Sequence, residues 1–552
     1  MPHQEWRLTA ASPPRRLLVM PDANLVFING RVHTVDANNT IAEAVAVSGE
    51  RILAVGSNAA VRPLAGPGTR VVDLAGRSLT PGFIDAHCHI GGLGGSFSAI
   101  DCKAPGMGSI RAFAEAVRER AAFQPPGTWI RGSGYDQTRV VEQRHPNRFD
   151  FDAVAPDHPV VFTRTCGHIA VGNSKAMELA GINDSTPDPA GGRYDREGGR
   201  NLGVCYETAQ AALQGVAALT PAEVRENILA AQAAYLKAGA TSVHDAGGLV
   251  GPGFVQIQGL HEAGELRLRV YAFGTDGFGD RPGSALVQSG VHTGFGDDRL
   301  RIGAYKVVTD GSTSGPTGAT RQPYTSNADD SGILYWQQNE LDSMVEAAHR
   351  AGFQVTVHAV GDRAIENYLD AISRAMDAFP RTNLRHRIEH CAILAPDLRA
   401  RVRRLGIVTA MQPAFFWEFG EGYIVNYGRE RADWFFPVKS MLAMGAIVAG
   451  SSDSPVTDYR PLFGIEQAIT RATSGGDCCG PEERLDLTAA LRLHSINGAY
   501  ASFEESQKGS IEAGKLADLA VLSEDIARLP VTELRDLPIA MTLVGGVIEY
   551  EG

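Results

Sequence analysis

Eight short apolar segments constrain the fold of this 552-residue chain more than any other feature. Each has the length of one buried strand, and they span residues 80–86, 240–246, 268–274, 301–309, 353–359, 386–393, 406–412 and 445–451. Several are separated by helical patterns, such as the capping box Thr220–Glu223, which opens a helix that stops near Gly239. Strands that alternate with helices form a parallel sheet, so eight of them predict the α/β class and a TIM-like (β/α)8 barrel.

The two ends of the chain have a different pattern, in which short strands alternate with glycine turns and helical patterns are missing. We expect residues 23–79 and 509–552 to form one small β-sandwich domain together. Within it, Asn29-Gly30 separates two apolar runs, 25–28 and 31–35, and predicts a hairpin, because both central residues of that turn adopt φ > 0.

The first two barrel segments are separated by residues 91–239, which are too many for a loop and predict an insertion or lid. Residues 1–22 contain too short an apolar stretch for an export signal and predict a flexible leader. The predicted domains are a leader at 1–22, a composite β-sandwich at 23–79 and 509–552, a barrel at 80–90 and 240–508, and an insertion at 91–239.

The composition excludes several classes of protein. Lys and Arg total 51 against 63 Asp and Glu, a formal charge of −12 without dense basic runs, which argues against nucleic-acid binding. No window approaches 18 uninterrupted apolar residues, so we expect no membrane span. Seven cysteines without a CxxC motif predict reduced thiols in a cytoplasmic protein. These features favour a cytoplasmic enzyme with a small-molecule substrate, for which a homodimer is the default assembly.

The first barrel segment ends in a possible metal-binding pair, His87 and His89. Residues i and i+2 of an extended chain point the same way, so two imidazoles can share one metal ion. An HxH motif alone is weak, because a histidine in a strand is more often a packed core residue. Cys88 between the two histidines points to the opposite side, and we interpret it as packing.

Four further side chains of metal-binding type follow the same logic. Lys306, His358, His390 and Asp453 lie on or just after the fourth, fifth, sixth and eighth segments. The carboxyl ends of the strands meet at one pole of a barrel, so these residues are expected to converge on His87 and His89. A lysine buried among apolar neighbours is costly unless it is neutralised or modified. The set predicts a metal site.

At this point the sequence resembles a known family. The phrase from Thr80 to His89, with Lys306, His358, His390 and Asp453, is similar to the metal-dependent amidohydrolase superfamily. The phrases 167–176, 306–312, 358–364, 388–390 and 509–519 resemble amidohydrolase family 3 in particular. The resemblance covers about residues 23–550 and implies a metallohydrolase barrel.

The resemblance implies a role for each candidate residue. His87 and His89 would hold a first metal ion, and His358 and His390 a second. Lys306 would be carboxylated and bridge the two, although some relatives use a single metal and an unmodified lysine could not bridge. Asp453 would bind the first metal and act as general base. Imidazole and oxygen donors without a thiolate favour zinc, with manganese, iron or cobalt as alternatives.

The implied reaction is hydrolysis of a non-peptide C–N bond, in an amide or an N-substituted formamide. A metal-bound hydroxide attacks the acyl carbon, and Asp453 passes the proton of the attacking water to the leaving nitrogen. A cyclic amide, a carbamate or a lactone is the alternative substrate, since the same attack serves all of them. A non-catalytic, metal-stabilised binding protein is less favoured, because the chain keeps every ligand and Asp453.

Four residues are weaker candidates for substrate binding. His168 and Tyr135 lie in the insertion, where a lid would reach the substrate. Phe415 and Trp417 follow the seventh segment, at the pole of the metal site, and would form either an apolar substrate wall or a packed loop.

Overall fold

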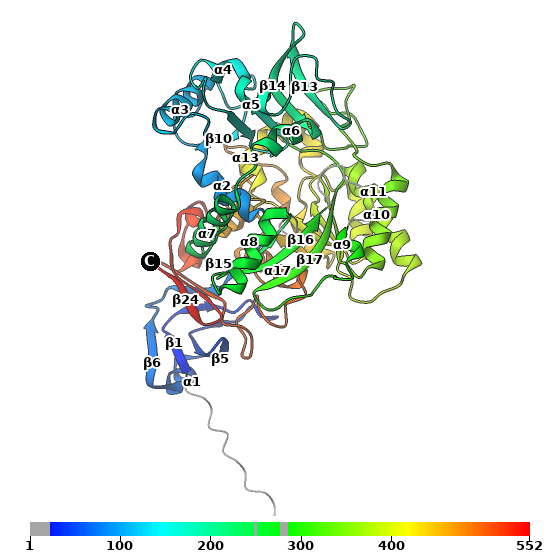
Figure 1. Cartoon of the computed structure of the whole chain (residues 1–552). Helices are drawn as coiled ribbons and strands as arrows, with labels where there is room; N and C mark the ends of the chain where they lie inside the picture. Colours follow the sequence, from blue (N-terminus) through cyan, green and yellow to red (C-terminus); the bar gives the residue numbers. More distant parts are fainter. Residues whose placement is uncertain (1–22, 248–250, 276–284) are drawn as a thin grey trace, which may run out of the picture.

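The computed structural model describes residues 23–247, 251–275 and 285–552. The expected leader, residues 1–22, lies outside this range. Figure 1 shows three layers, with the insertion at the top, the barrel in the middle and the strands of the two chain ends at the bottom. Among the described residues, no helix has both the length and the apolar character that crossing a bilayer requires.

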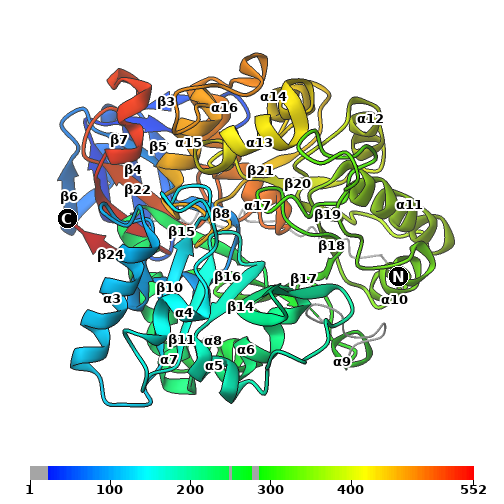
Figure 2. The same ribbon diagram turned by 90° about the horizontal axis from the view of Figure 1, so that it is seen from above.

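Eight parallel strands form the barrel, and each falls within or overlaps one of the eight expected segments. Neighbours in the sheet follow the order of the chain, as the ring of strands in Figure 2 shows. The strands are β8 (Phe83–Cys88), β15 (Ala240–Asp245), β16 (Arg269–Thr275), β17 (Leu300–Val308), β18 (Val355–Ala359), β19 (Arg387–His390), β20 (Val408–Met411) and β21 (Val448–Gly450). The predicted α/β barrel is confirmed.

The ring closes just beyond the strand ends. The backbone N–H of Asp453 donates to the His87 carbonyl at 2.8 Å, and that of His89 donates to the Ser454 carbonyl at 2.9 Å. These two hydrogen bonds join the first barrel strand to the segment after the last one. They therefore also fix the spacing of three candidate ligands.

Helices surround the ring and place their apolar faces on it. The predicted capping box is present, because Thr220 and Glu223 bond each other's backbone N–H at the start of α7. Gly239, with φ of +81°, follows the end of this helix, as expected. The surrounding helices include α7 (Pro221–Lys237), α8 (Gly251–Glu262), α10 (Gln338–Arg350), α11 (Asp362–Ala378), α12 (Pro396–Arg404), α13 (Phe415–Ala432), α14 (Val438–Ala443), α15 (Pro461–Thr470), α16 (Leu487–Leu493) and α17 (Ile496–Ala501).

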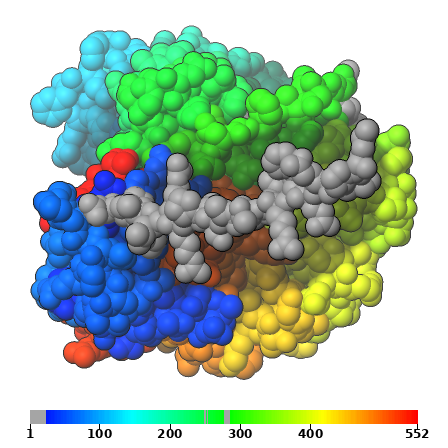
Figure 3. Space-filling model, turned by 90° about the horizontal axis from the view of Figure 1, so that it is seen from below, coloured from blue at the N-terminus to red at the C-terminus, as the bar shows by residue number. Residues whose placement is uncertain are grey.

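The chain ends supply two further sheets. One has the order β5-β4-β1-β6, and the other, β24-β23-β22-β7-β2-β3, combines strands from both ends. Side chains of both sheets share one apolar core that includes Phe27, Val45, Leu79, Leu519 and Leu543. Seen from below, the N-terminal strands lie beside the barrel (Figure 3). The strands are β1 (Ala23–Ile28), β2 (Arg31–His33), β3 (Ile41–Ala42), β4 (Ala44–Ser48), β5 (Arg51–Gly56), β6 (Ala65–Asp73), β7 (Ser78–Pro81), β22 (Leu519–Leu522), β23 (Ile539–Val544) and β24 (Val547–Glu551).

The expected hairpin at Asn29-Gly30 is wrong. β1 and β2 enter different sheets, where β1 pairs with β4 and β6 and β2 pairs with β3 and β7. Only Asn29 has a positive φ, of 56°, so the two-residue turn that joins paired strands is not formed. The Asn29 and Gly30 N–H groups instead donate to the Asn58 side chain and the Glu43 carbonyl.

The first barrel strand also starts later than expected. Thr80 and Pro81 belong to β7, which pairs with β22 of the terminal sheet, and the barrel strand begins at Phe83. Gly82 separates the two strands and packs so closely on Thr241 that a Cβ would lie 2.3 Å from its side chain. The apolar run is continuous, but it crosses from one sheet to another.

The insertion has a mixed sheet of its own, in the order β13-β14-β12-β11-β10-β9. It lies over one end of the barrel (Figure 1). Its elements are β9 (Ile100–Asp101), α3 (Ile110–Phe123), β10 (Ile130–Tyr135), α4 (Arg148–Asp152), β11 (Val160–Arg164), β12 (Ile169–Gly172), α5 (Ser174–Leu179), β13 (Gly192–Glu197), β14 (Arg200–Glu207) and α6 (Ala211–Val216), and α2 (Ile90–Ser98) precedes them.

A buried ion pair joins the barrel to the terminal sheet. The Arg269 guanidinium donates to both carboxylate oxygens of Asp518, at 2.7 and 2.9 Å, and the side chains are 4% and 3% exposed. Asp518 also accepts the Gly545 N–H at 2.8 Å. The pair is therefore shielded from solvent and salt.

We expect Asp518→Asn to lower the free energy of unfolding by about 3–5 kcal/mol, because it leaves the buried Arg269 charge without a counter-ion. Urea unfolding followed by circular dichroism measures this. Glu115→Gln is the control, since Glu115 pairs with Arg118 on the surface, where both side chains are 55% exposed, and such pairs contribute about 0–1 kcal/mol. Equal effects of the two substitutions would contradict the expectation.

Candidate metal centre

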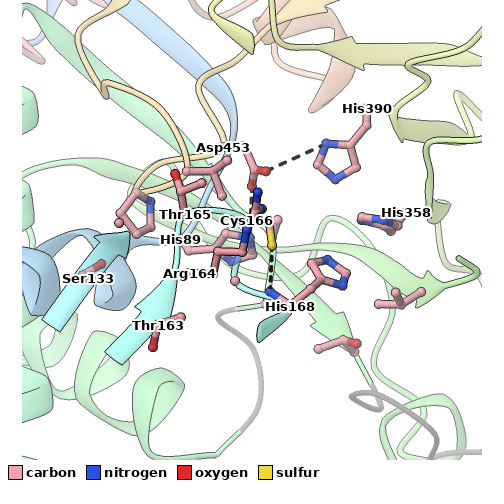
Figure 4. Close-up of a pocket in the computed structure, with 18 of the residues that line it drawn as sticks. His89, Ser133, Thr163, Arg164, Thr165, Cys166, His168, His358, His390 and Asp453 are labelled. Carbon is pink, nitrogen blue, oxygen red and sulfur yellow. Dashed lines mark hydrogen bonds and ion pairs between the residues drawn. The ribbon is translucent and has the colours of Figure 1, made fainter. Parts of the chain in front are cut away.

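The predicted ligands meet at the carboxyl pole of the barrel, below the insertion. A cavity of about 330 Å³ opens there, and its lining includes His89, Lys306, His358, His390 and Asp453. Figure 4 shows Asp453 near the centre of this group, His358 and His390 to its right, and Ser133 and Thr163 of the insertion to its left. His87 is fully buried directly behind Asp453 and His89.

The closest group consists of His87, His89 and Asp453, whose potential ligand atoms all lie within 4.8 Å of one another. Asp453 Oδ1 is 3.4 Å from His87 Nε2 and 3.3 Å from His89 Nε2. Lys306 Nζ lies 3.4 Å from His87 Nε2. Two imidazoles and a carboxylate at this spacing can close around one divalent cation.

His390 and His358 continue the group across the cavity. The ring centroids of His87 and His390 are 4.8 Å apart, and those of His390 and His358 are 4.5 Å apart. His390 Nδ1 is 3.9 Å from Asp453 Oδ2. The structure therefore brings all six predicted residues to one place.

Hydrogen bonds fix the orientation of three of the imidazole rings. His87 Nδ1 bonds Glu389 Oε2 at 2.5 Å, His390 Nδ1 bonds Gln412 Oε1 at 3.0 Å, and His358 Nε2 bonds the Gly311 carbonyl at 2.9 Å. These oxygens only accept, so the bonded nitrogen carries the proton, and in a neutral ring the opposite nitrogen has the lone pair. A metal site needs this arrangement.

The charge states suit a cation as well. Burial lowers the pKa of His390 to about 3 and that of His358 well below its usual value, so both rings are neutral at physiological pH. Burial opposes ionisation of Asp453, but its close contacts with His87 and His89 hold its pKa well below the usual range. Burial also lowers the pKa of Lys306. The donor set fits a divalent metal ion.

Two of the candidate ligands have strained backbones. Asp453 has φ of 55° and His390 has φ of 67°, in the left-handed region that side chains other than glycine rarely adopt. Such conformations cost on the order of 1–3 kcal/mol each and cluster at functional sites. Here they turn the chain at the ends of two barrel strands, toward the cavity.

Two of the weaker candidates line this region. His168 faces the cavity and donates to Glu207 Oε2 at 2.7 Å. Burial disfavours its charged form, but the Glu207 carboxylate outweighs this and raises the His168 pKa to about 9. Phe415 lies beside His390, with ring centroids 6.2 Å apart. It lines a small extension of the cavity.

The other two candidates point elsewhere. Tyr135 is fully buried in the core of the insertion, where its hydroxyl bonds His145 Nδ1 at 3.0 Å. The Arg535 guanidinium lies over the ring of Trp417, with its carbon 4.0 Å from the ring centroid. Phe415 and Trp417 are two positions apart on a helix, so their side chains leave α13 on nearly opposite sides. The apolar wall expected at this position thus includes only Phe415.

Several residues of the cavity come from the insertion and have no motif that predicts them. Ser133 lies on β10 and Arg164 on β11, and Thr165 and Cys166 follow β11. Arg164 donates to Gln137 at 2.7 Å and to Ser314 at 3.1 Å. Only the folding of the insertion over the barrel brings them to the site. Glu389 could have been identified, because it precedes His390 in the phrase 388–390.

A second cavity, of about 510 Å³, adjoins the first. The two share Ser133, Gly134 and Pro455 in their linings, so they lie side by side at the mouth of the candidate site. Phe97 and Tyr459 form one side of this second cavity, with ring centroids 6.0 Å apart. The site can therefore accept a molecule larger than its reacting group.

Comparisons with known proteins identify the family of the chain. Residues 70–550 match the model of the amidohydrolase family. The chain is 32% identical over 550 residues to N-substituted formamide deformylase of Arthrobacter pascens, covering 96% of this chain and 98% of the relative. It is 29% identical over 537 residues to the putative amidohydrolase YtcJ of Bacillus subtilis, covering 95% and 99%.

Solved structures give the same result. An uncharacterised metal-dependent hydrolase from Pyrococcus furiosus is 28% identical with a TM-score of 0.73, covering 91% of this chain and 99% of its own. One from Pyrococcus horikoshii is 26% identical with a TM-score of 0.76, covering 92% and 99%. The predicted family and enzyme class are confirmed, and the chain belongs to the amidohydrolase family of metal-dependent hydrolases.

Proposed function

We propose that the protein hydrolyses the C–N bond of a small amide or N-substituted formamide. The observation that carries the proposal is the convergence of His87, His89, Lys306, His358, His390 and Asp453 on one cavity of a barrel. The relative that is 32% identical over nearly the whole chain is named for deformylation of N-substituted formamides. Hydrolysis of a C–N bond at this site would account both for the convergence of the six side chains and for the similarity to this relative.

The proposed cofactor is a pair of zinc ions. His87, His89 and Asp453 would hold one, and His358 and His390 the other. Lys306, carboxylated on its amine, would bridge them, and its lowered pKa favours the neutral amine that this modification requires. When bound, zinc lowers the pKa of a water ligand toward about 7 and polarises a carbonyl oxygen.

The residues of the chain supply the proton transfers. Asp453 is ionised and lines the cavity beside His390, so its carboxylate can accept the proton of the attacking water. The same carboxyl group then donates that proton to the leaving nitrogen. The hydrogen bonds of His87, His358 and His390 commit one nitrogen of each ring to a protein acceptor, and the role of proton carrier is assigned to Asp453.

The two cavities suggest how a substrate lies. The acyl group belongs in the first cavity beside Asp453, and the N-substituent extends past Gly134 and Pro455 into the second. Phe97 and Tyr459 offer it an apolar surface. A cyclic amide, a carbamate or a lactone fits the same ligands, and a comparison of initial rates on an N-substituted formamide, the matching acetamide and a lactone distinguishes the substrate classes.

We propose that the enzyme works in the cytoplasm. All seven cysteines are unpaired, six of them buried, as suits a protein of the reducing cytoplasm. The homodimer expected from the sequence stays a prediction, which sedimentation velocity tests.

The metal content of the protein tests the proposed cofactor. We expect about two zinc equivalents per chain in protein purified without chelator, and fewer in Lys306→Ala, because that variant loses the bridge between the two sites. Elemental analysis of both proteins measures this. One equivalent that the substitution does not change would make the site mononuclear, and no stoichiometric metal in folded protein would refute the hydrolase proposal.

The proposed role of Asp453 as general base gives another prediction. We expect Asp453→Asn to lower kcat on an N-substituted formamide by about 10²–10⁴-fold, the usual contribution of a positioned acid or base. Cys88→Ala is the matched control, because Cys88 ends β8 between His87 and His89 and packs into the barrel's apolar core. A normal rate for Asp453→Asn, or an equal loss in both variants, would contradict the role assigned to Asp453.

A further inference from the structure

A charged network lies in the barrel interior beneath His87. Arg387 and Glu389 are two positions apart on β19, so both side chains point into the barrel. Both residues are fully buried, and their side chains form an ion pair of 2.8 Å. A buried pair of this kind is a weak source of stability, so its position beneath the candidate metal site needs another explanation.

Each oxygen of Glu389 accepts two hydrogen bonds. Oε1 accepts Arg387 Nε at 2.8 Å and the Thr356 hydroxyl at 2.6 Å. Oε2 accepts Arg387 Nη2 at 3.0 Å and His87 Nδ1 at 2.5 Å. A carboxyl group with four donors has no place for a proton of its own, so Glu389 is an anion. His87 Nδ1 must therefore be the protonated nitrogen, and Nε2 faces Asp453.

Arg387 is itself held in place by the neighbouring strands. Nη2 also donates to the Ala86 carbonyl at 2.8 Å, and Nη1 donates to His244 Nδ1 at 3.0 Å. The guanidinium stays charged under all physiological conditions and binds a carboxylate in a fixed, two-pronged geometry. It thus anchors Glu389 to β8 and β15 as well as neutralising it.

The anchoring matters for the ring above. Arg387 donates to each oxygen of Glu389, at 2.8 and 3.0 Å, and so holds the carboxylate in one orientation toward His87. The hydrogen bond from His87 Nδ1 then fixes the plane of the ring and directs Nε2 toward Asp453 and Lys306. A ring held in this way presents the same nitrogen to a cation.

We propose that Glu389 and Arg387 are positioning residues that hold His87 in its metal-binding tautomer and thereby set the affinity of the site for its divalent cation. The proposal rests on the proposed function only in assuming that His87 is a ligand. It assigns a role to a buried ion pair that touches neither the cavity nor the substrate.

The test measures zinc binding rather than turnover. Metal-free wild type and Glu389→Gln are titrated with Zn²⁺ in competition with a chromogenic chelator. We expect binding about 10–100-fold weaker in the variant, the usual effect of removing a partner of a metal-bound histidine. The visible spectrum of the Co²⁺-loaded proteins should change as well, since it reports the ligands around the ion.

Two further variants separate positioning from stability. Asp518→Asn removes a carboxylate that is just as buried and just as firmly paired with an arginine, but lies between the barrel and the terminal sheet. It should destabilise the protein and leave zinc affinity unchanged. The double variant Arg387→Met with Glu389→Leu removes both charges, a replacement that folded proteins often tolerate, and should also bind zinc about 10–100-fold more weakly.

The outcomes distinguish this proposal from the proposed function. If wild type binds zinc and the Glu389 variants bind it equally well, the positioning role is overturned while the hydrolase proposal stands. If Asp518→Asn weakens zinc binding as much as Glu389→Gln does, the effect reflects stability and the positioning role is again overturned. If folded wild type binds no zinc, both proposals fail together.

Discussion

The site depends on the way the barrel closes. His87 and His89 lie at and just after the end of the first strand, Asp453 follows the last one, and two backbone hydrogen bonds join these segments. Asp85 strengthens the join, because its carboxylate accepts hydrogen bonds from the backbone and hydroxyl of Ser452 and from the Tyr235 hydroxyl. A barrel that closes in this register brings two imidazoles and a carboxylate within reach of one cation. Closure of the barrel in this register therefore places three of the six candidate ligands.

The insertion is fastened to the barrel by contacts that also shape the cavity. Glu207 bonds His168 within the insertion and the hydroxyls of Thr317 and Tyr335 on the loop after β17, at 3.0 and 2.7 Å. Arg164 bonds Ser314 on the same loop. Glu207 has φ of 51°, a strained conformation that these partners hold in place. The roof over the candidate ligands is therefore fixed by polar contacts rather than by apolar packing alone.

How far the sequence predicts this molecule depends on the range of the interaction involved. Barrel strands are buried on both faces, so each appears as a continuous apolar run, and ligands at their ends can be placed by topology alone. Asn29-Gly30 misled because a local turn signal does not specify which sheet the next strand joins. Tyr135 and Trp417 misled because proximity in sequence does not fix the side from which a residue leaves its strand or helix. Ser133 and Arg164 line the cavity only because the insertion packs on the barrel, and the sequence does not predict how these two distant parts of the chain meet.

The barrel interior and the insertion contribute different residues to the region of the candidate site. Arg387, Glu389 and His87 connect the barrel interior to the ligands, and none of them lines the cavity that a substrate would enter. The insertion contributes Ser133, Arg164 and His168 to that cavity but none of the candidate ligands. A change in the insertion can therefore reshape the cavity without touching the candidate ligands, while a change at Arg387 or Glu389 acts on His87 without reshaping the cavity. Barrels with the same candidate ligands can then accept different substrates if their insertions differ, because function depends on the site and not on the fold alone.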